Sequence, residues 1–241
     1  VVNCAVTLGS KRGERARRLH ELENSCRVLG FKNVVAGGDM GLTSVEREVR
    51  KSHPEEWVYK ATALQEVLEA ERAAIVLLPH QNDFHPTHIG VHFLVVDALR
   101  RCALRIGHKA IMLVETAYWC DLPRPNLMVE VTAEQEALLV TALAQHVGEV
   151  KRNPYHRLHP ARMIDQARRG SEVVGELAGA GRSLFADLYR VTFMHGKTML
   201  KGNDARRCYA PAEAITFDGL VQSFWPLSRS PVLAHQTTKR G

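Results

Sequence analysis

The order of apolar runs and amphipathic stretches along the first half of the chain constrains its fold more than any other feature. Apolar runs with the length and composition of buried strands alternate with stretches whose apolar residues recur at helical spacing. The strand-like runs are 2–8, 31–36, 73–78, 109–115 and 126–131, and the helical stretches between them are 14–29, 61–68 and 88–106. This alternation is typical of parallel strands joined by helices, so the sequence predicts an α/β protein: a Rossmann-like three-layer fold with a mostly parallel sheet.

Two further helices are predicted at 133–147 and 160–174, and the character of the sequence changes after residue 190. The apolar residues of 191–241 show no sustained period, and breaker-rich stretches interrupt them. The same residues hold seven Lys and Arg against three acids, which is most of the net charge of +6. We therefore predict one domain over residues 1–190 and a loosely ordered or accessory extension over 191–241.

Composition excludes several classes of protein. No stretch approaches the roughly 18 uncharged apolar residues that a membrane span needs, so we expect none. The one basic cluster outside the extension, residues 11–18, contains no aromatic side chain that could stack a base, so a nucleic-acid partner is not expected. The five cysteines are an odd number without a C-x-x-C pair, which favours a reducing, cytoplasmic location. A homo-oligomer is left open.

Four histidines gather between the strand-like run 73–78 and the helical stretch that follows it. Residues 80–92 hold His80, His85, His88 and His92, where about 0.65 histidines are expected from the 12 in 241 residues. Pro86 suits the first turn of a helix, so His85 lies at the turn and His88 just inside the helix, three residues apart and able to converge on one point. Because imidazole is the commonest metal ligand, this spacing predicts a metal site.

Asp83 stands where its carboxylate can accept a hydrogen bond from one of these rings and so fix the tautomer. His92, one helical turn beyond His88, is a candidate third ligand on the same face. The alternative is that the rings cap the helix and satisfy hydrogen bonds inside the core. That alternative applies above all to His92, which lies in the apolar run 91–96.

Two other loops follow strand-like runs, at the edge where ligands bind in open α/β sheets. The loop from Gly9 to Gly13 opens a helix, where backbone N–H groups favour an anion, but the glycine motifs of nucleotide-binding proteins are absent. Asp39 lies in the glycine-rich loop 37–41. It is either a turn residue or a ligand contact.

These pieces together resemble, in their order, the PIG-L/LmbE-like family of zinc-dependent N-deacetylases, which act on N-acetylglucosamine-type substrates. The matching pieces are a strand leading to Thr7-Leu8-Gly9, a helix that carries Arg18-x-x-Glu21 and ends in Leu29-Gly30, the loop 38–42, and Asp83-Phe84-His85-Pro86-Thr87-His88. The last piece is similar to the family's Asp-x-His-Pro-x-His signature. The resemblance covers residues 1–190 and implies the family's Rossmann-like fold.

The resemblance implies that His88 binds a zinc ion (Zn²⁺) and that His85 lies beside the metal and polarises the amide carbonyl. Asp83, which can orient one of these rings, is a candidate catalytic residue together with His85. The candidates for binding the amino-sugar substrate are then Gly9, Arg18 and Asp39. The family's other zinc ligands and its general-base aspartate come from an Ala-His-Pro-Asp-Asp motif upstream of the first matching strand. This sequence contains no such motif. We therefore expect that the chain begins inside the domain and that the site is incomplete in this fragment.

The activity that the resemblance implies is hydrolysis of an N-acetyl group from an N-acetylglucosamine-type substrate. In such chemistry zinc lowers the pKa of its bound water, a carboxylate takes the proton, and a histidine steadies the oxyanion. Two alternatives from other classes stay open. One is a non-catalytic carbohydrate-binding module that uses the same crevice, and the other is a phosphate or nucleotide binder built on the Gly9–Gly13 loop.

Overall fold

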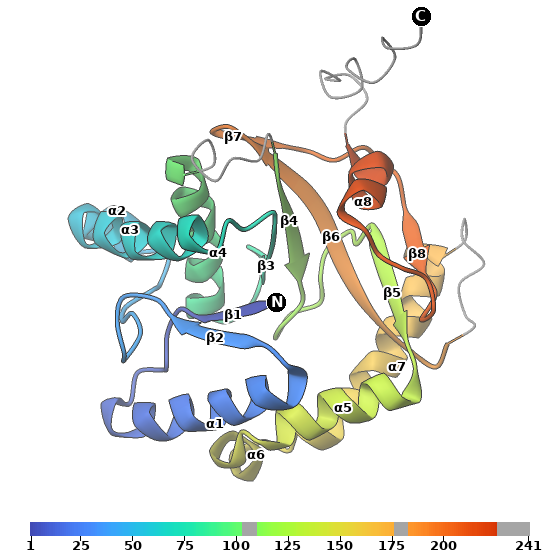
Figure 1. Ribbon diagram of the computed structural model, residues 1–241, viewed down its shortest axis with the longest axis horizontal. Coiled ribbons are helices and arrows are strands. Elements are labelled where there is room, and N and C mark those ends of the chain that lie inside the picture. The colour runs from blue at the N-terminus through green and yellow to red at the C-terminus, as the bar shows by residue number, and fades with distance from the viewer. Residues whose placement is uncertain (103–109, 176–182, 226–241) are drawn as a thin grey trace, which may run out of the picture.

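The computed structural model describes residues 1–102, 110–175 and 183–225, and its helices and strands form a layered α/β architecture (Figure 1). Helices lie on both sides of a central sheet, as the sequence predicts. The described helices are α1 (Arg15–Leu29), α2 (Val49–Ser52), α3 (Pro54–Ala70), α4 (Pro86–Cys102), α5 (Ala133–Ala144), α6 (Val147–Arg152), α7 (Tyr155–Val173) and α8 (Phe217–Phe224), with a 3-10 turn at Arg12–Glu14.

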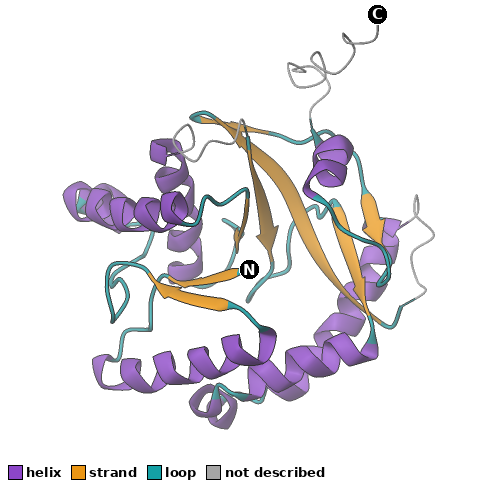
Figure 2. Cartoon of the chain, in the orientation of Figure 1, coloured by secondary structure: helices purple, strands orange, loops and turns teal. Residues whose placement is uncertain are grey.

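The strands form two sheets (Figure 2). The strands are β1 (Val2–Ala5), β2 (Lys32–Val35), β3 (Ile75–Pro79), β4 (Ile111–Thr116), β5 (Leu127–Val131), β6 (Phe185–His195), β7 (Thr198–Leu200) and β8 (Arg207–Tyr209). Strands β1 and β2 pair in parallel with each other. The larger sheet has the order β3-β4-β6-β5-β8, and β7 pairs with the end of β6.

Strand β6 runs against its neighbours in the larger sheet. Strand β3 is parallel to β4 and β5 is parallel to β8, whereas β6 pairs antiparallel with β4, β5 and β7. All other strands of this sheet therefore share one direction, and the prediction of a mostly parallel sheet is confirmed. The carboxyl ends of β3 and β4 lie at the same edge, because the two strands pair in register from Ile75 with Met112 to Pro79 with Thr116.

Side chains that alternate along β4 separate the core into two layers. Ile111 and Leu113 face a cluster formed with α3 and α4, whereas Met112 and Val114 face a second cluster on the opposite side of the sheet. Helix α4 packs closely against the segment that follows β2. A Cβ atom on Gly90 would lie 1.6 Å from the carbonyl oxygen of Val45, so a glycine is required at this contact. The close contact fixes the position of the helix that carries His88.

The predicted division at residue 190 is wrong, because it falls inside strand β6. Residues 198–224 add β7, β8 and α8, and their side chains belong to the core rather than to an accessory extension. Leu220 and Phe224 of α8 are buried against Met112, Val191 and Phe193 of the sheet. The part of the prediction that concerns residues 226–241 lies outside the described residues.

Several elements are longer or shorter than predicted. Helix α3 begins at Pro54 rather than at residue 61, because a proline is well suited to the first turn of a helix. Helix α7 begins at Tyr155 and continues through Pro160. The end of the helix predicted at 88–106 lies outside the described residues, within which α4 ends at Cys102. Within the described ranges, no helix has the length and apolar character that crossing a membrane requires.

Candidate active site

Residues 80–88, called the histidine loop below, form the connection between β3 and α4 together with the first residues of α4, at the carboxyl edge of the sheet. Strand β3 ends at Pro79, and Pro86 is the first residue of α4. The two prolines thus fix both ends of a six-residue loop, 80–85, that contains Asp83 and His85. The rings of His85 and His88 come together, with centroids 4.8 Å apart.

Asp83 is the centre of the loop's hydrogen bonding, and its side chain is fully buried. One carboxylate oxygen, Oδ1, accepts the backbone N–H of His85 at 2.9 Å and lies 3.2 Å from Nδ1 of His88. The other oxygen, Oδ2, accepts the backbone N–H groups of Trp119 at 2.9 Å and Cys120 at 3.4 Å. Burial alone would raise the pKa of Asp83, but these backbone hydrogen bonds outweigh it and the pKa is lowered. The group is therefore a carboxylate at neutral pH.

The contact with Asp83 sets the tautomer of His88. Burial lowers the pKa of His88, although the charge of Asp83 acts in the opposite direction. The neutral ring then places its proton on Nδ1, facing the carboxylate, and leaves the lone pair of Nε2 available to a metal ion or a proton. The side chain keeps 23% of its surface exposed, which gives a ligand access to it.

His85 has the opposite tautomer. Its Nδ1 accepts the backbone N–H of Thr87 at 3.2 Å, so the neutral ring carries its proton on Nε2. His85 is exposed, and it is therefore a hydrogen-bond donor at the surface of the site. The loop thus presents two neighbouring imidazoles, one with a free lone pair and the other with a free N–H.

The other two histidines of the segment serve the core. His92 is 4% exposed, and its Nδ1 lies 3.0 Å from the carbonyl oxygen of Pro79 and 3.4 Å from a carboxylate oxygen of Glu115. Its pKa is lowered by burial. His80 is 2% exposed, and its Nε2 contacts the carbonyl oxygen of Cys120 at 3.0 Å. The structure therefore supports the alternative in which His92 is a buried structural histidine, and not the third ligand.

Gly9 and Arg18 belong to a separate cluster at the end of β1. The guanidinium of Arg18 donates to the carbonyl oxygen of Leu8 at 3.2 Å and pairs with Glu149 at 3.1 Å. The backbone N–H of Gly9 donates to Oγ1 of Thr7, and the Gly9 carbonyl accepts from Arg15. Within the described part of the chain, none of these hydrogen bonds or ion pairs of Gly9 and Arg18 reaches the histidine loop.

The Gly9–Gly13 loop uses several of its backbone groups in its own hydrogen bonds. Its first amide N–H already has Thr7 as its acceptor, and the carbonyl oxygens of Leu8 and Gly9 face guanidinium groups. Asp39 is exposed on its loop, which joins the end of β1 through the bridge between Thr7 and Gly41. Gly9 and Asp39 therefore lie in loops at the same end of the β1–β2 sheet. The contacts of the described residues do not indicate which ligand, if any, these loops bind.

The histidine loop fits one part of a zinc site and not the whole. Catalytic zinc sites use three protein ligands and an open position. Among the residues that the structure describes, no group of three His, Cys, Asp or Glu side chains is placed to hold a metal ion. The segment therefore presents one imidazole nitrogen with a lone pair that Asp83 orients, Nε2 of His88.

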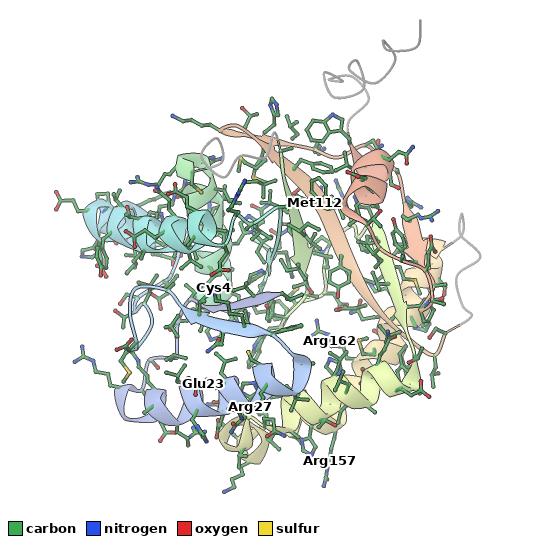
Figure 3. The ribbon with its side chains drawn as sticks, viewed as in Figure 1. Cys4, Glu23, Arg27, Met112, Arg157 and Arg162 are labelled. Carbon is green, nitrogen blue, oxygen red and sulfur yellow. The ribbon has the colours of Figure 1, made fainter. Side chains whose placement is uncertain are left out.

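The aromatic residues beside the histidines were missed by the sequence reasoning. Tyr118 and Trp119 follow β4, the neighbour of β3, and their rings lie 4.9 Å from the ring of His88 and 5.9 Å from that of His85. Arg162 of α7, which Figure 3 labels, donates to the carbonyl oxygens of Ala117 and Tyr118. The sequence did contain a signal: Tyr118 and Trp119 come shortly after the strand-like run 109–115. Residues that follow neighbouring parallel strands meet at the same edge of a sheet, so this pair could be expected near the histidines that follow the run 73–78.

An Asp83→Asn substitution should lower the free energy of unfolding by about 2 kcal/mol at pH 7, because the amide replaces a charged acceptor that uses both oxygens. The folded pKa of Asp83 lies below the ordinary value of 3.8. The difference in free energy of unfolding between wild type and variant should therefore be complete above about pH 5. It should be lost as the pH falls through the folded-state pKa of Asp83. Urea unfolding of both proteins at pH 7 and pH 3 measures the difference. Asp165→Asn, at an exposed ion pair with Arg168, is the matched control. Equal losses in the two variants would contradict the role of Asp83.

Comparison with known proteins shows that the fold of this chain also occurs in other proteins. No protein-family model matches the chain, and no curated protein matches it. Two solved structures share the fold at low sequence identity. The conserved protein TT1542 from Thermus thermophilus is 16% identical, with 78% of each chain covered and a TM-score of 0.51. The A40926 pseudoaglycone deacetylase Dbv21 is 14% identical, with 81% of this chain and 85% of that chain covered and a TM-score of 0.56.

A third solved structure is N,N'-diacetylchitobiose deacetylase from Pyrococcus horikoshii, at 20% identity with 79% of this chain and 69% of that chain covered, and a TM-score of 0.49. At these identities the first two comparisons establish that the α/β fold of this chain occurs in other proteins. They cover most of the described elements, and so they support the architecture drawn from the sequence.

Proposed function

We propose that the protein hydrolyses the N-acetyl group of an N-acetylglucosamine-type substrate, with zinc as its cofactor. The observation that carries the proposal is the pair of imidazoles of His85, at the end of the β3–α4 loop, and His88, in the first turn of α4, which the buried carboxylate of Asp83 orients. The fold supports the proposal, because one of the solved structures that share it is a deacetylase. Fold alone does not assign chemistry, so the argument rests on the loop.

The chain's own residues account for the part of the reaction that concerns the amide carbonyl. Attack on an acetamide moves negative charge onto the carbonyl oxygen, and a donor already aimed at that oxygen stabilises the charge. His85 is such a donor, because Thr87 occupies its Nδ1 and leaves Nε2–H for the substrate. Asp83 ties the backbone of His85 and the ring of His88 to one buried group, so the two imidazoles keep their relative position.

Zinc, when bound, would supply a water of lowered pKa. We assign to it a single ligand from this chain, Nε2 of His88, and the described residues do not complete its coordination. We also propose that the protein works in the reducing cytoplasm, because its five cysteines are an odd number without a C-x-x-C pair.

Release of acetate from methyl N-acetylglucosaminide tests the proposed function. The protein is expressed from the complete reading frame that contains these 241 residues and is assayed with added Zn²⁺ and with EDTA. We expect turnover that EDTA abolishes, and a loss of about 100-fold in kcat for His85→Ala, as removal of one oxyanion donor costs. His53→Ala, at an exposed histidine on another loop, should leave turnover unchanged. Binding of the glycoside without acetate release would instead favour a carbohydrate-binding module.

A further inference from the structure

Three aromatic side chains are exposed around the imidazole pair. Trp119 keeps 59% of its surface exposed, Tyr118 47% and Phe84 75%. Large aromatic side chains contribute most when they are buried, so a group of exposed ones beside polar side chains marks a surface that a ligand covers. Phe84 directly precedes His85 in the chain, and the rings of Trp119 and Tyr118 lie next to those of His85 and His88.

The loop that carries Tyr118 and Trp119 is held from two sides. On one side, Asp83 accepts the backbone N–H groups of Trp119 and Cys120. On the other side, Arg162 donates to the carbonyl oxygens of Ala117 and Tyr118 at 2.7 and 2.6 Å. Because the backbone is fixed at consecutive residues, exposure of the two rings is not the result of a loose loop. A binding surface fixed before the ligand arrives loses less entropy on binding.

The two rings are placed one at each imidazole. The ring of Trp119 is tilted by 44° to that of His85, with centroids 5.9 Å apart, and the ring of Tyr118 is tilted by 48° to that of His88. Each imidazole of the pair therefore has one aromatic ring beside it.

The chemistry of these surfaces suits a sugar ring. One face of a pyranose consists of C–H groups that pack on an aromatic ring, while its edge carries hydroxyl and acetamide groups that need polar partners. Trp119 offers the aromatic surface, and the N–H of His85 is the polar partner next to it. We propose that Trp119, with Tyr118 beside it, is the platform on which the pyranose that carries the N-acetyl group lies. This inference rests on the proposed function, which it deepens by naming the residues that recognise the sugar ring.

The test compares Trp119→Ala with Trp119→Phe on two acetamides, methyl N-acetylglucosaminide and the acyclic N-acetylethanolamine. For the glycoside, we expect Trp119→Ala to raise KM about 10-fold with little change in kcat, and Trp119→Phe to stay within about 3-fold of wild type, since stacking surfaces are worth about this much. For the acyclic acetamide, both variants should match wild type. Tyr59→Ala, at a residue on α3 that is 64% exposed, is the control for loss of a surface aromatic side chain.

A second measurement separates this inference from the proposed function. The dissociation constant of the glycoside is measured by calorimetry in EDTA, where no turnover occurs. Weaker binding by Trp119→Ala without acetate release by the wild type would retain the platform and reject the deacetylase. Equal binding by wild type and Trp119→Ala, or equal losses of Trp119→Ala on the glycoside and the acyclic acetamide, would overturn the platform even where acetate is released.

Discussion

Replacing His88 with alanine should have the largest effect on activity of any single change in the histidine loop. Removing a residue that only hydrogen-bonds to a metal ligand lowers metal affinity roughly 10- to 100-fold, and removing the ligand itself should lower it further. We therefore expect losses on the order of 1000-fold in Zn²⁺ affinity and in acetate release. The physical reason is that Nε2 of His88 is the one ligand position that the buried carboxylate of Asp83 orients. Zinc content after dialysis against a competing chelator, measured on the product of the complete reading frame, checks the expectation.

His20→Ala is the matched control, because His20 is exposed on α1. It should retain the zinc content and the rate of the wild type. His88→Gln should fail in the same way as alanine, since an amide is a poor ligand for zinc. Unchanged zinc content in His88→Ala, with the fold intact by circular dichroism, would contradict the assignment of His88 as a ligand.

The histidine loop shows how much of a site local sequence can predict. The density of histidines, Asp83 before them and Pro86 between them all concern residues within one short loop and the first turn of a helix. Their geometry is therefore set by local rules, and the structure places His85 and His88 next to each other, with Asp83 in contact with His88. The partners from the next strand are different. Trp119 reaches this loop because β3 pairs with β4, a contact between residues 36 positions apart that no local pattern contains.

The same distinction between local and long-range contacts applies to the three residues predicted to bind the substrate. Gly9, Arg18 and Asp39 follow strands, as the histidine loop does, but they belong to the β1–β2 pair rather than to the larger sheet. Arg18 could be expected to face a substrate from its position in a helix. In the structure its guanidinium is occupied by the carbonyl oxygen of Leu8 and by Glu149, a residue far along the chain.

The C-terminal part was misjudged although a signal was present. Phe217, Leu220, Val221 and Phe224 follow the spacing i, i+3, i+4 and i+7 of a helix, and Thr216 before them caps it by accepting the N–H of Gly219. The pattern spans only two turns, and the breakers on both sides made it look isolated. Strand β6 was missed for another reason: it enters the sheet between β4 and β5, against their direction, which the expectation of parallel crossovers does not anticipate.

Replacing Phe224 with alanine should destabilise the protein more than any surface change, which tests the C-terminal part directly. Phe224 is fully buried in the cluster that joins α8 to β4 and β6, where Leu220 and Phe193 are its neighbours. Removing a buried phenylalanine ring leaves a cavity and costs about 3–5 kcal/mol. For a chain of this length that corresponds to a fall in Tm of roughly 6–20 °C. Urea unfolding and thermal unfolding of the purified variant measure both quantities.

Phe84→Ala removes the same ring from a position where it is 75% exposed, and it should change the free energy of unfolding by less than about 0.5 kcal/mol. The two variants differ in where the ring is packed and not in its chemistry. A loss in Phe224→Ala as small as that in Phe84→Ala would mean that α8 lies loosely on the sheet and that residues 198–224 are an extension after all. A large loss confined to Phe224→Ala would instead show that α8 and the larger sheet unfold as one cooperative unit. The reason is that the cavity would open in the cluster that α8 shares with strand β4.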